Sequence, residues 1–180
     1  MIKDGHWDYT EDGCMVQTYG GEKTYQVAFD MLSSSCRSVE DWGSGYGYFK
    51  ATYGNKLPIS NVDSAMGANV DISCDLSDRS PESDGVLLRH ILEHNPDSWL
   101  KIVRNACVAH ELVIVCFLNP KEPLFVPDRI VTEAIPEDVL LDLLWAEGFS
   151  VYRRTVDEPS GFPAGHQTFN TEWVYHAREK

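Results

Sequence analysis

Three alternating glycines that follow an acidic residue constrain this sequence more than any other feature. The segment Val39 to Trp42 is predicted to be a strand, and it contains Asp41 and runs directly into Gly43-Ser44-Gly45-Tyr46-Gly47. A helix is expected from Tyr48 to Tyr53, ended by Gly54. Glycines in such a turn let a ligand approach the backbone closely and permit conformations that a Cβ atom would forbid. The pattern therefore predicts a cofactor at the carboxyl end of a strand.

The spacing of the glycines excludes two common phosphate-binding loops. The dinucleotide-binding fingerprint would need its third glycine at the position of Tyr48, and the loop of nucleotide hydrolases would end in Gly-Lys-Ser or Gly-Lys-Thr. Asp41 also argues against a pyrophosphate, which its negative charge would repel, and favours a ligand with a cationic amino group. A glycine-rich turn without a ligand is the alternative interpretation.

Strands and helices alternate along the rest of the chain. Leu112 to Leu118 is the most apolar predicted strand, as expected for a central parallel strand that is covered on both faces. The last two strands are joined by a loop over 157–170 and are expected to form an antiparallel pair. The other strands are expected at Ile59–Asp63, Val70–Cys74, Gly85–Leu88, Val151–Val156 and Glu172–Ala177, and the other helices at Thr24–Ser34, Asp97–His110 and Pro136–Glu147. This order predicts an α/β fold with a mostly parallel sheet and helices on both faces.

Length and composition fit one soluble domain. The chain has 180 residues, of which 43% are hydrophobic and 24% charged. Its formal net charge of −13 would repel a phosphate backbone, so no extended nucleic-acid partner is expected. The five cysteines include no Cys-x-x-Cys pair, which argues against a zinc ribbon or a disulfide framework. No apolar run approaches the roughly 20 residues that cross a bilayer, and the N-terminus carries no signal pattern, so a cytoplasmic location without a membrane partner is expected.

Two further acids are predicted to end neighbouring strands. Asp63, followed by Ser64, lies about 20 residues beyond the glycine loop, where a carboxylate can accept both hydroxyl groups of a ribose. Asp75 ends the next strand in the same way, so its side chain could meet an adenine edge while Leu76 packs on the ring. The alternative for each acid is a turn or helix-cap residue, in the case of Asp75 before Ser77.

These residues resemble the class I S-adenosylmethionine-dependent methyltransferases over about Val39 to Leu118. The resemblance implies a Rossmann-like fold with a seven-stranded sheet that closes on an antiparallel pair, and S-adenosyl-L-methionine as the cofactor, converted to S-adenosyl-L-homocysteine. It further implies the cofactor-binding roles. Asp41 with Gly43, Ser44, Gly45 and Gly47 would hold the methionine end, Asp63 with Ser64 the ribose, and Asp75 with Leu76 the adenine. The stretch from Arg89 to Asn105 also resembles a small uncharacterised bacterial and phage subgroup.

The segment His90-Ile91-Leu92-Glu93-His94 supports several interpretations. It has the His-x-x-Glu-His spacing of an inverted zinc peptidase, but Asn95-Pro96 follows at once and breaks the long helix that such a site needs. Some related methyltransferases bind a divalent metal through Glu-x-x-Glu-His, from which His90 departs, and no metal is assigned here. His90, Glu93 and His94 are instead the candidate catalytic residues, because a histidine has a pKa suited to a general base at neutral pH.

Arg89 stands directly after four apolar or small residues at a predicted strand end. It could face the cofactor pocket and orient an anionic group, since arginine matches carboxylates and phosphates in a bidentate way. The alternative is a surface salt bridge to Asp41, Asp63 or Asp84.

The expected protein is a single methyltransferase domain over residues 1–180. It would comprise an N-terminal segment and helix (1–37), a cofactor-binding core (38–118), and a substrate-side loop, helix and closing strand pair (119–180). The N-terminal segment, residues 90–99 and the loop 119–135 would form the acceptor site. The acceptor is expected to be a small molecule, a sugar precursor or a protein, and the enzyme a monomer or homodimer. A non-catalytic module of the same fold, which binds the cofactor or a partner, is the alternative.

Overall fold

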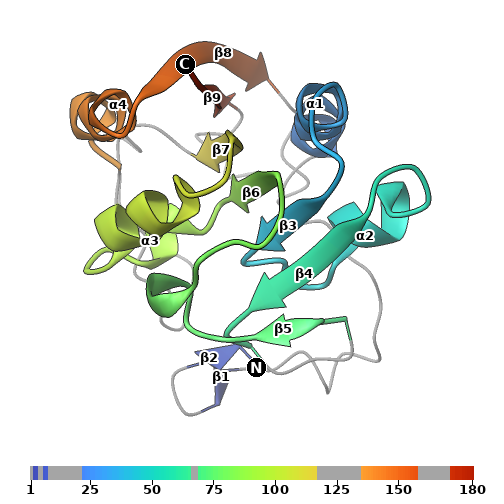
Figure 1. Cartoon of the computed structure of the whole chain (residues 1–180). Coiled ribbons are helices and arrows are strands. Elements are labelled where there is room, and N and C mark those ends of the chain that lie inside the picture. The colour runs from blue at the N-terminus through green and yellow to red at the C-terminus, as the bar shows by residue number, and fades with distance from the viewer. Residues whose placement is uncertain (1, 4–5, 8–21, 66–68, 117–134, 158–170) are drawn as a thin grey trace.

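A seven-stranded sheet forms the centre of the molecule (Figure 1). The computed structural model describes residues 2–3, 6–7, 22–65, 69–116, 135–157 and 171–180. Within these ranges the sheet has the order β5-β4-β3-β6-β7-β9-β8. Its strands are β3 (Val39–Trp42), β4 (Ile59–Asp63), β5 (Ile72–Ser73), β6 (Gly85–Arg89), β7 (Glu111–Cys116), β8 (Phe149–Asp157) and β9 (Thr171–Glu179). A separate antiparallel pair consists of β1 (Ile2–Lys3) and β2 (His6–Trp7).

The direction of the strands confirms the predicted fold class. β3 pairs in parallel with β4 and β6, β4 with β5, and β6 with β7. β9 lies between β7 and β8 and is antiparallel to both. The chain runs outward from β3 to β5 and then continues with β6 on the other side of β3, so the strand order reverses between β3 and β6. Open α/β sheets bind their ligands at such a switch point, outside the carboxyl ends of the strands.

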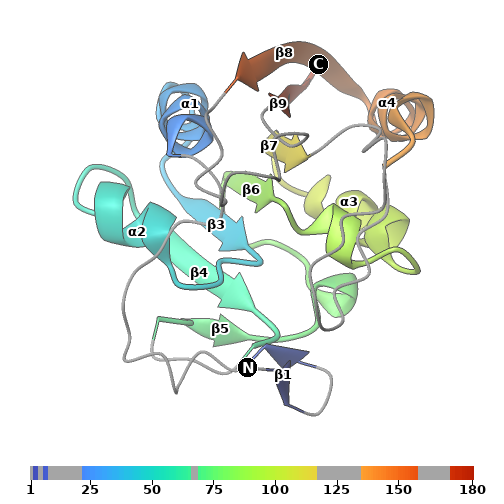
Figure 2. The same ribbon diagram turned by 180° about the vertical axis from the view of Figure 1, so that it is seen from behind.

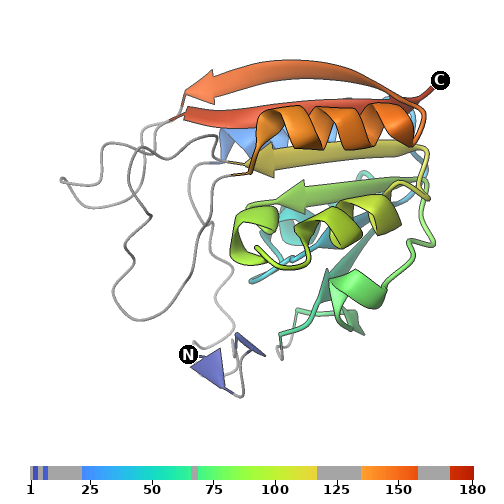
Figure 3. The same cartoon turned by 90° about the vertical axis from the view of Figure 1, so that its left-hand side faces the viewer.

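Two helices cover each face of the sheet (Figures 1 and 2). α1 (Lys23–Leu32) and α2 (Tyr48–Tyr53) pack on one face, where their aromatic and aliphatic side chains meet Leu87 and Val113 of the central strands. α3 (Trp99–Ala106) and α4 (Glu137–Ala146) pack on the other face and run alongside the strands that they cover (Figure 3). Successive residues of β7 alternate between the two clusters, which explains why this strand is apolar throughout.

Most predicted elements are present, with shifted ends. The bounds of β3, α2 and β4 are those expected, whereas the third strand is reduced to Ile72–Ser73 because β5 is an edge strand paired only with β4. The fourth strand extends to Arg89, and the helix expected at Asp97–His110 covers only Trp99–Ala106. Phe117 and Leu118, expected in the most apolar strand, lie outside the described residues. None of the described helices is long and apolar enough to span a membrane.

Candidate functional site

The glycine loop lies at the switch point and depends on glycine at three positions. Gly43, Gly45 and Gly47 have φ of 74°, 52° and 73°, in the left-handed region that disfavours other residues. A Cβ atom on Gly43 would lie 2.5 Å from Cδ1 of Ile91, and one on Gly47 would lie 2.6 Å from Nδ2 of Asn61. The first and third glycines therefore also allow close packing within the protein, in addition to the close ligand approach that the sequence suggested.

Asp41 lies at the base of this loop as a buried acid. Only 2% of the residue is exposed, and burial raises the pKa of Asp41 to about 7; the Arg89 guanidinium opposes this rise and Asp63 adds to it. Asp41 Oδ2 and Ser44 Oγ are buried and have no hydrogen-bond partner among the described residues. Buried polar atoms are nearly always paired, so two orphaned atoms at the junction of β3 and the glycine loop point to a polar ligand. A cationic amino group would fit beside Asp41.

Asp63 connects the end of β4 to the glycine loop. Its Oδ2 accepts a hydrogen bond from the Gly45 amide at 2.9 Å, and its Oδ1 accepts one from the Ala65 amide at 2.8 Å. An ionised carboxylate has about four lone-pair sites, so Asp63 retains capacity for further donors such as hydroxyl groups. Ser64 is half-buried in the bend that follows.

Asp75 and Leu76 take different positions after β5. Asp75 is exposed and caps the short 3₁₀ turn Leu76–Asp78, because its Oδ1 accepts a hydrogen bond from the Ser77 amide at 2.8 Å. The cap expected as its alternative role is thus present, and it leaves the adenine role as a prediction. Leu76 is buried in the cluster on the α3 side of the sheet.

A buried carboxylate that the sequence analysis missed holds this turn against β3. Glu40 accepts hydrogen bonds from Arg79 at 2.8 Å, from the Trp42 indole at 2.7 Å and from the Glu82 amide at 2.8 Å. These bonds lower the pKa of Glu40 although burial opposes the change. In the sequence Glu40 is visible as a glutamate inside the predicted strand Val39 to Trp42, but only the structure shows that this strand is buried along its whole length.

Arg89 is buried at the end of β6, so the alternative interpretation, a surface salt bridge, is wrong. Its Nη2 is 3.1 Å from Glu172 Oε1, its Nε donates to Thr24 Oγ1 at 3.0 Å, and its guanidinium lies 4.1 Å from the centre of the Tyr25 ring. The reason is the central place of β6 between β3 and β7, beneath α1. Asp84, one of the expected partners, instead binds the exposed Arg37 at 3.1 Å.

His90 follows in a strained backbone conformation, with both ring nitrogens engaged. Its φ of 52° is the only positive value at a described non-glycine residue. Nδ1 lies 3.3 Å from Glu93 Oε1, and Nε2 contacts Glu172 Oε1. Burial and Arg89 lower the pKa of His90, but the hydrogen bonds with Glu172 and Glu93 outweigh them and the pKa is raised. Both ring nitrogens therefore face carboxylates, which favour the protonated form of the ring.

The helix break expected after His94 is present. Leu92–His94 form a single 3₁₀ turn that ends at Asn95, so the two histidines do not share a long helix. Glu93 is 1% exposed and His94 is half-buried. In the described part of the chain no group of three histidine, cysteine, aspartate or glutamate side chains could hold a metal ion.

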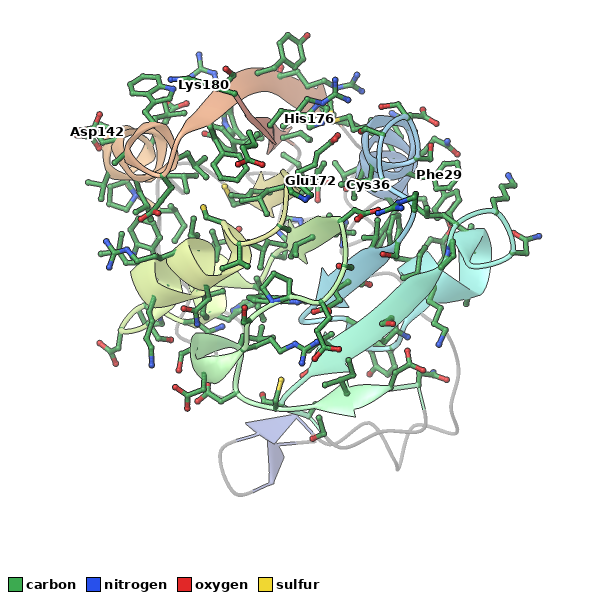
Figure 4. All side chains as sticks on the ribbon, in the orientation of Figure 1. Phe29, Cys36, Asp142, Glu172, His176 and Lys180 are labelled. Carbon is green, nitrogen blue, oxygen red and sulfur yellow. The ribbon has the colours of Figure 1, made fainter. Side chains whose placement is uncertain are left out.

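Thr24, Tyr25 and Glu172 are the site residues that sequence reasoning missed. Glu172 lies on β9, the strand between β7 and β8 (Figure 4), and is separated from His90 by 82 positions. No local pattern connects residues so far apart, because their contact depends on the insertion of β9 beside β7. The N-terminal segment and the loop before Ile135, both expected in the acceptor site, lie mostly outside the described residues.

The comparisons with known proteins bear on the fold. The sequence matches no protein-family model, and it is not significantly similar to any curated protein. Among solved structures, the chain is similar to magnesium protoporphyrin IX methyltransferase from Synechocystis PCC 6803, bound to S-adenosylhomocysteine. The TM-score is 0.67 at 16% identity over 88% of this chain and 83% of the other.

Two further structures show how much chemistry this fold accommodates. The 1,6-didemethyltoxoflavin-N1-methyltransferase from Burkholderia thailandensis, bound to its substrate and S-adenosylhomocysteine, has a TM-score of 0.64 at 18% identity over 88% of this chain and 77% of the other. The [4+2]-cyclase SpnF has a TM-score of 0.65 at 13% identity over 88% and 81%. The chain therefore has the Rossmann-like fold of the class I S-adenosylmethionine-dependent methyltransferases.

Proposed function

We propose that this protein is an S-adenosylmethionine-dependent methyltransferase. The observation that carries the proposal is a pair of orphaned buried atoms at the switch point of the sheet: Asp41 Oδ2 at the end of β3 and Ser44 Oγ in the left-handed glycine loop. The cofactor would meet these atoms with its methionine end, which offers a cationic amino group and a carboxylate. Two of the three solved structures named above, which share this fold, contain S-adenosylhomocysteine.

The chemistry of the residues fits the rest of the cofactor. Asp63 keeps acceptor capacity for the ribose hydroxyls, with Ser64 beside it, and Asp75 and Leu76 would meet the adenine edge and ring. Arg89 would contribute to the cofactor site through its positive charge, which opposes the rise in the pKa of Asp41 and so favours the ionised carboxylate. When bound, the cofactor supplies an electrophilic methyl group on a sulfonium.

The protein's own residues would orient the methyl acceptor and receive its proton. Alignment of a nucleophile behind the methyl group can lower the barrier by about 7–11 kcal/mol when the geometry is optimal. His90 and Glu93 are buried and bound to each other, so His94, which is half-buried on the same turn, is the better candidate for the residue that accepts a proton. His90 and Glu93 would then contribute by shaping the segment that carries it.

The acceptor is proposed to be a small molecule, a sugar precursor or a protein. The net charge of −13 disfavours a nucleic-acid duplex. The solved methyltransferases named above act on a toxoflavin precursor and a magnesium porphyrin, by their names. We propose a cytoplasmic enzyme that works as a monomer or homodimer.

Calorimetry followed by a transfer assay tests this function. Purified protein is titrated with S-adenosylmethionine and S-adenosylhomocysteine, and micromolar binding of both is expected. Tritiated methyl transfer into fractions of cell extract is then measured. Absence of binding would refute the cofactor site, whereas tight binding without transfer to any fraction would favour the non-catalytic module. Transfer is measured separately from binding because the fold alone does not specify methyl transfer: SpnF, which shares it, is named as a cyclase.

A further inference from the structure

Four buried side chains at the ends of β6 and β9 form a chain in which basic and acidic residues alternate. Arg89 binds Glu172 at 3.1 Å, Glu172 contacts His90 with the same oxygen, and His90 lies 3.3 Å from Glu93. The side chains of these residues are each at most 3% exposed. Ion pairs removed from water depend on every partner, because loss of one leaves an uncompensated charge. Glu172 occupies the middle of this chain, between Arg89 and His90.

The backbone at His90 links this network to the glycine loop. A left-handed conformation is disfavoured for a residue with a Cβ atom, so the surrounding contacts must maintain it. This conformation turns the chain directly after β6 and presents Ile91 to the loop. The Ile91 side chain fills the space that a Cβ atom of Gly43 would need, at 2.5 Å from its ideal position. A change in the His90 backbone would therefore move a group that lies against the first glycine of the loop.

A second buried carboxylate binds a histidine and an arginine far from this loop. Glu111, at the start of β7, contacts His176 and binds Arg178 at 3.2 Å, and it also accepts a hydrogen bond from Ser35. Glu111 is 4% exposed and Glu172 is 2% exposed. Glu111 is the first residue of β7, whereas Glu172 lies next to the carboxyl end of β7. The two clusters therefore lie at opposite ends of the strands. Glu111 is therefore a suitable control: it is as buried as Glu172 and binds the same two residue types, but it lies far from the glycine loop.

We propose that Glu172 is a positioning residue of the cofactor site, which holds His90 in its left-handed conformation and thereby keeps Ile91 against the glycine loop. Glu172 does not need to touch the cofactor for this role. The inference rests on the proposed function, since it assumes that the glycine loop binds S-adenosylmethionine.

The test compares Glu172→Gln with Glu111→Gln. Both variants keep the size of the side chain and remove a buried charge between a histidine and an arginine. Affinity for S-adenosylhomocysteine is measured by calorimetry, and unfolding by urea. Both variants should lose stability, but Glu172→Gln should bind about tenfold more weakly or worse, while Glu111→Gln should stay within about twofold of the wild type. Equal affinities of the two variants would overturn the proposal.

Nitrogen NMR of the histidine rings provides a readout that a merely structural role would not change. At pH 6 both ring nitrogens of His90 should carry protons in the wild type, because the two carboxylates raise its pKa above the ordinary value. In Glu172→Gln the ring should become neutral, because Arg89 remains beside it without the intervening carboxylate. In Glu111→Gln the signal of His90 should be unchanged. A His90 ring that remains doubly protonated in Glu172→Gln would contradict the proposed arrangement.

Two variants of His90 itself keep the test decisive if Glu172→Gln does not fold. Glycine adopts the left-handed conformation freely, whereas alanine does not. His90→Gly should therefore retain affinity better than His90→Ala, by roughly fivefold or more. Identical affinities of these two variants would refute a role for the backbone conformation. A wild-type protein that binds no S-adenosylhomocysteine would refute the proposed function, whereas wild-type binding that Glu172→Gln leaves unchanged would refute only this inference.

Discussion

The carboxylate of Asp63 accepts a hydrogen bond from the Gly45 amide at 2.9 Å, so the acid that ends β4 holds the middle of the loop that follows β3. One residue thereby serves the shape of the loop and, by our proposal, the ribose of the cofactor. These two roles can be separated by experiment, because the first affects stability and the second affects binding.

Replacement of Asp63 by alanine should weaken S-adenosylhomocysteine binding by roughly ten- to a hundredfold, since a hydrogen bond to a charged group contributes about 1.5–3 kcal/mol. Stability should fall as well, because two backbone amides lose their acceptor. Asp71→Ala is the control: Asp71 also accepts a backbone amide, from Asn61 at 2.7 Å, but it is exposed. Calorimetry that shows equal affinities for both variants would mean that Asp63 has no contact with the cofactor.

Substitution of Gly45 by valine should abolish cofactor binding, because its φ of 52° disfavours a side chain and the loop must approach the ligand. Gly148→Val is the matched control, since Gly148 has φ of 93° and open space around its Cβ position. Each variant should lose roughly 1–2 kcal/mol or more of stability from the strained backbone. If the folded Gly45→Val protein binds like Gly148→Val, the loop is not the cofactor site.

Affinity for the cofactor should fall as the pH is lowered from 8 to 6. With a pKa of about 7, Asp41 is largely protonated below that pH in the free protein, and a neutral carboxyl attracts an amino group less strongly. Affinity should therefore decrease below pH 7, by up to about tenfold per unit. Calorimetry in buffers of different ionisation enthalpy should detect proton release on binding at pH 6. An affinity that is constant over this range would contradict the role of Asp41.

The same acid should destabilise the free protein at high pH. The pKa of Asp41 is raised in the folded state above the unfolded value of 3.8, so its stabilising contribution is present below that value and is lost as the pH rises through about 7. Asp41→Asn should therefore raise the unfolding free energy at pH 8, by roughly 1–3 kcal/mol, while it weakens cofactor binding. A variant that is both less stable and equally tight in binding would refute this assignment. Urea denaturation at pH 5 and pH 8 measures the difference.

Removal of the Arg79 charge should destabilise the protein strongly. Arg79→Met leaves the Glu40 carboxylate buried with one partner fewer, and broken buried pairs typically cost about 3–5 kcal/mol. Lys101→Met is the control, because its pair with Asp78 has side chains that are 58% and 74% exposed. Its effect should be small, as for most surface ion pairs. Similar urea midpoints for the two variants would show that the Glu40 pair contributes little.

Treatment with a chelator should leave the fold and the affinity for S-adenosylhomocysteine unchanged. Neither depends on a metal in our proposal, although transfer could still decrease if a divalent ion helps to orient the acceptor. Circular dichroism and calorimetry before and after dialysis against the chelator measure both properties. Stoichiometric zinc in elemental analysis, together with chelator-sensitive cleavage of a peptide library, would instead support the peptidase interpretation of residues 90–94.

Local sequence signals determined the core of the fold by themselves. The bounds of β3, α2 and β4 agree with the expectation, because a buried strand, a glycine loop and a short helix each leave a signal within a few residues. Asn95-Pro96 likewise marks the end of the turn after β6, since proline restricts the residue before it. The alternation of strands and helices was enough to predict a mostly parallel sheet.

Only the tertiary structure decided the surroundings of Arg89 and His90. The sequence left Arg89 with two interpretations, a role at the cofactor pocket or a surface salt bridge, and it made His90 one of three candidate catalytic residues. The fold buries both residues against Glu172. This contact requires β9 to insert beside β7 and join residues more than 80 positions apart. Such a contact depends on the packing of β9 against β7 and on opposite charges close enough to offset the cost of their burial, and neither leaves a periodic pattern in the chain.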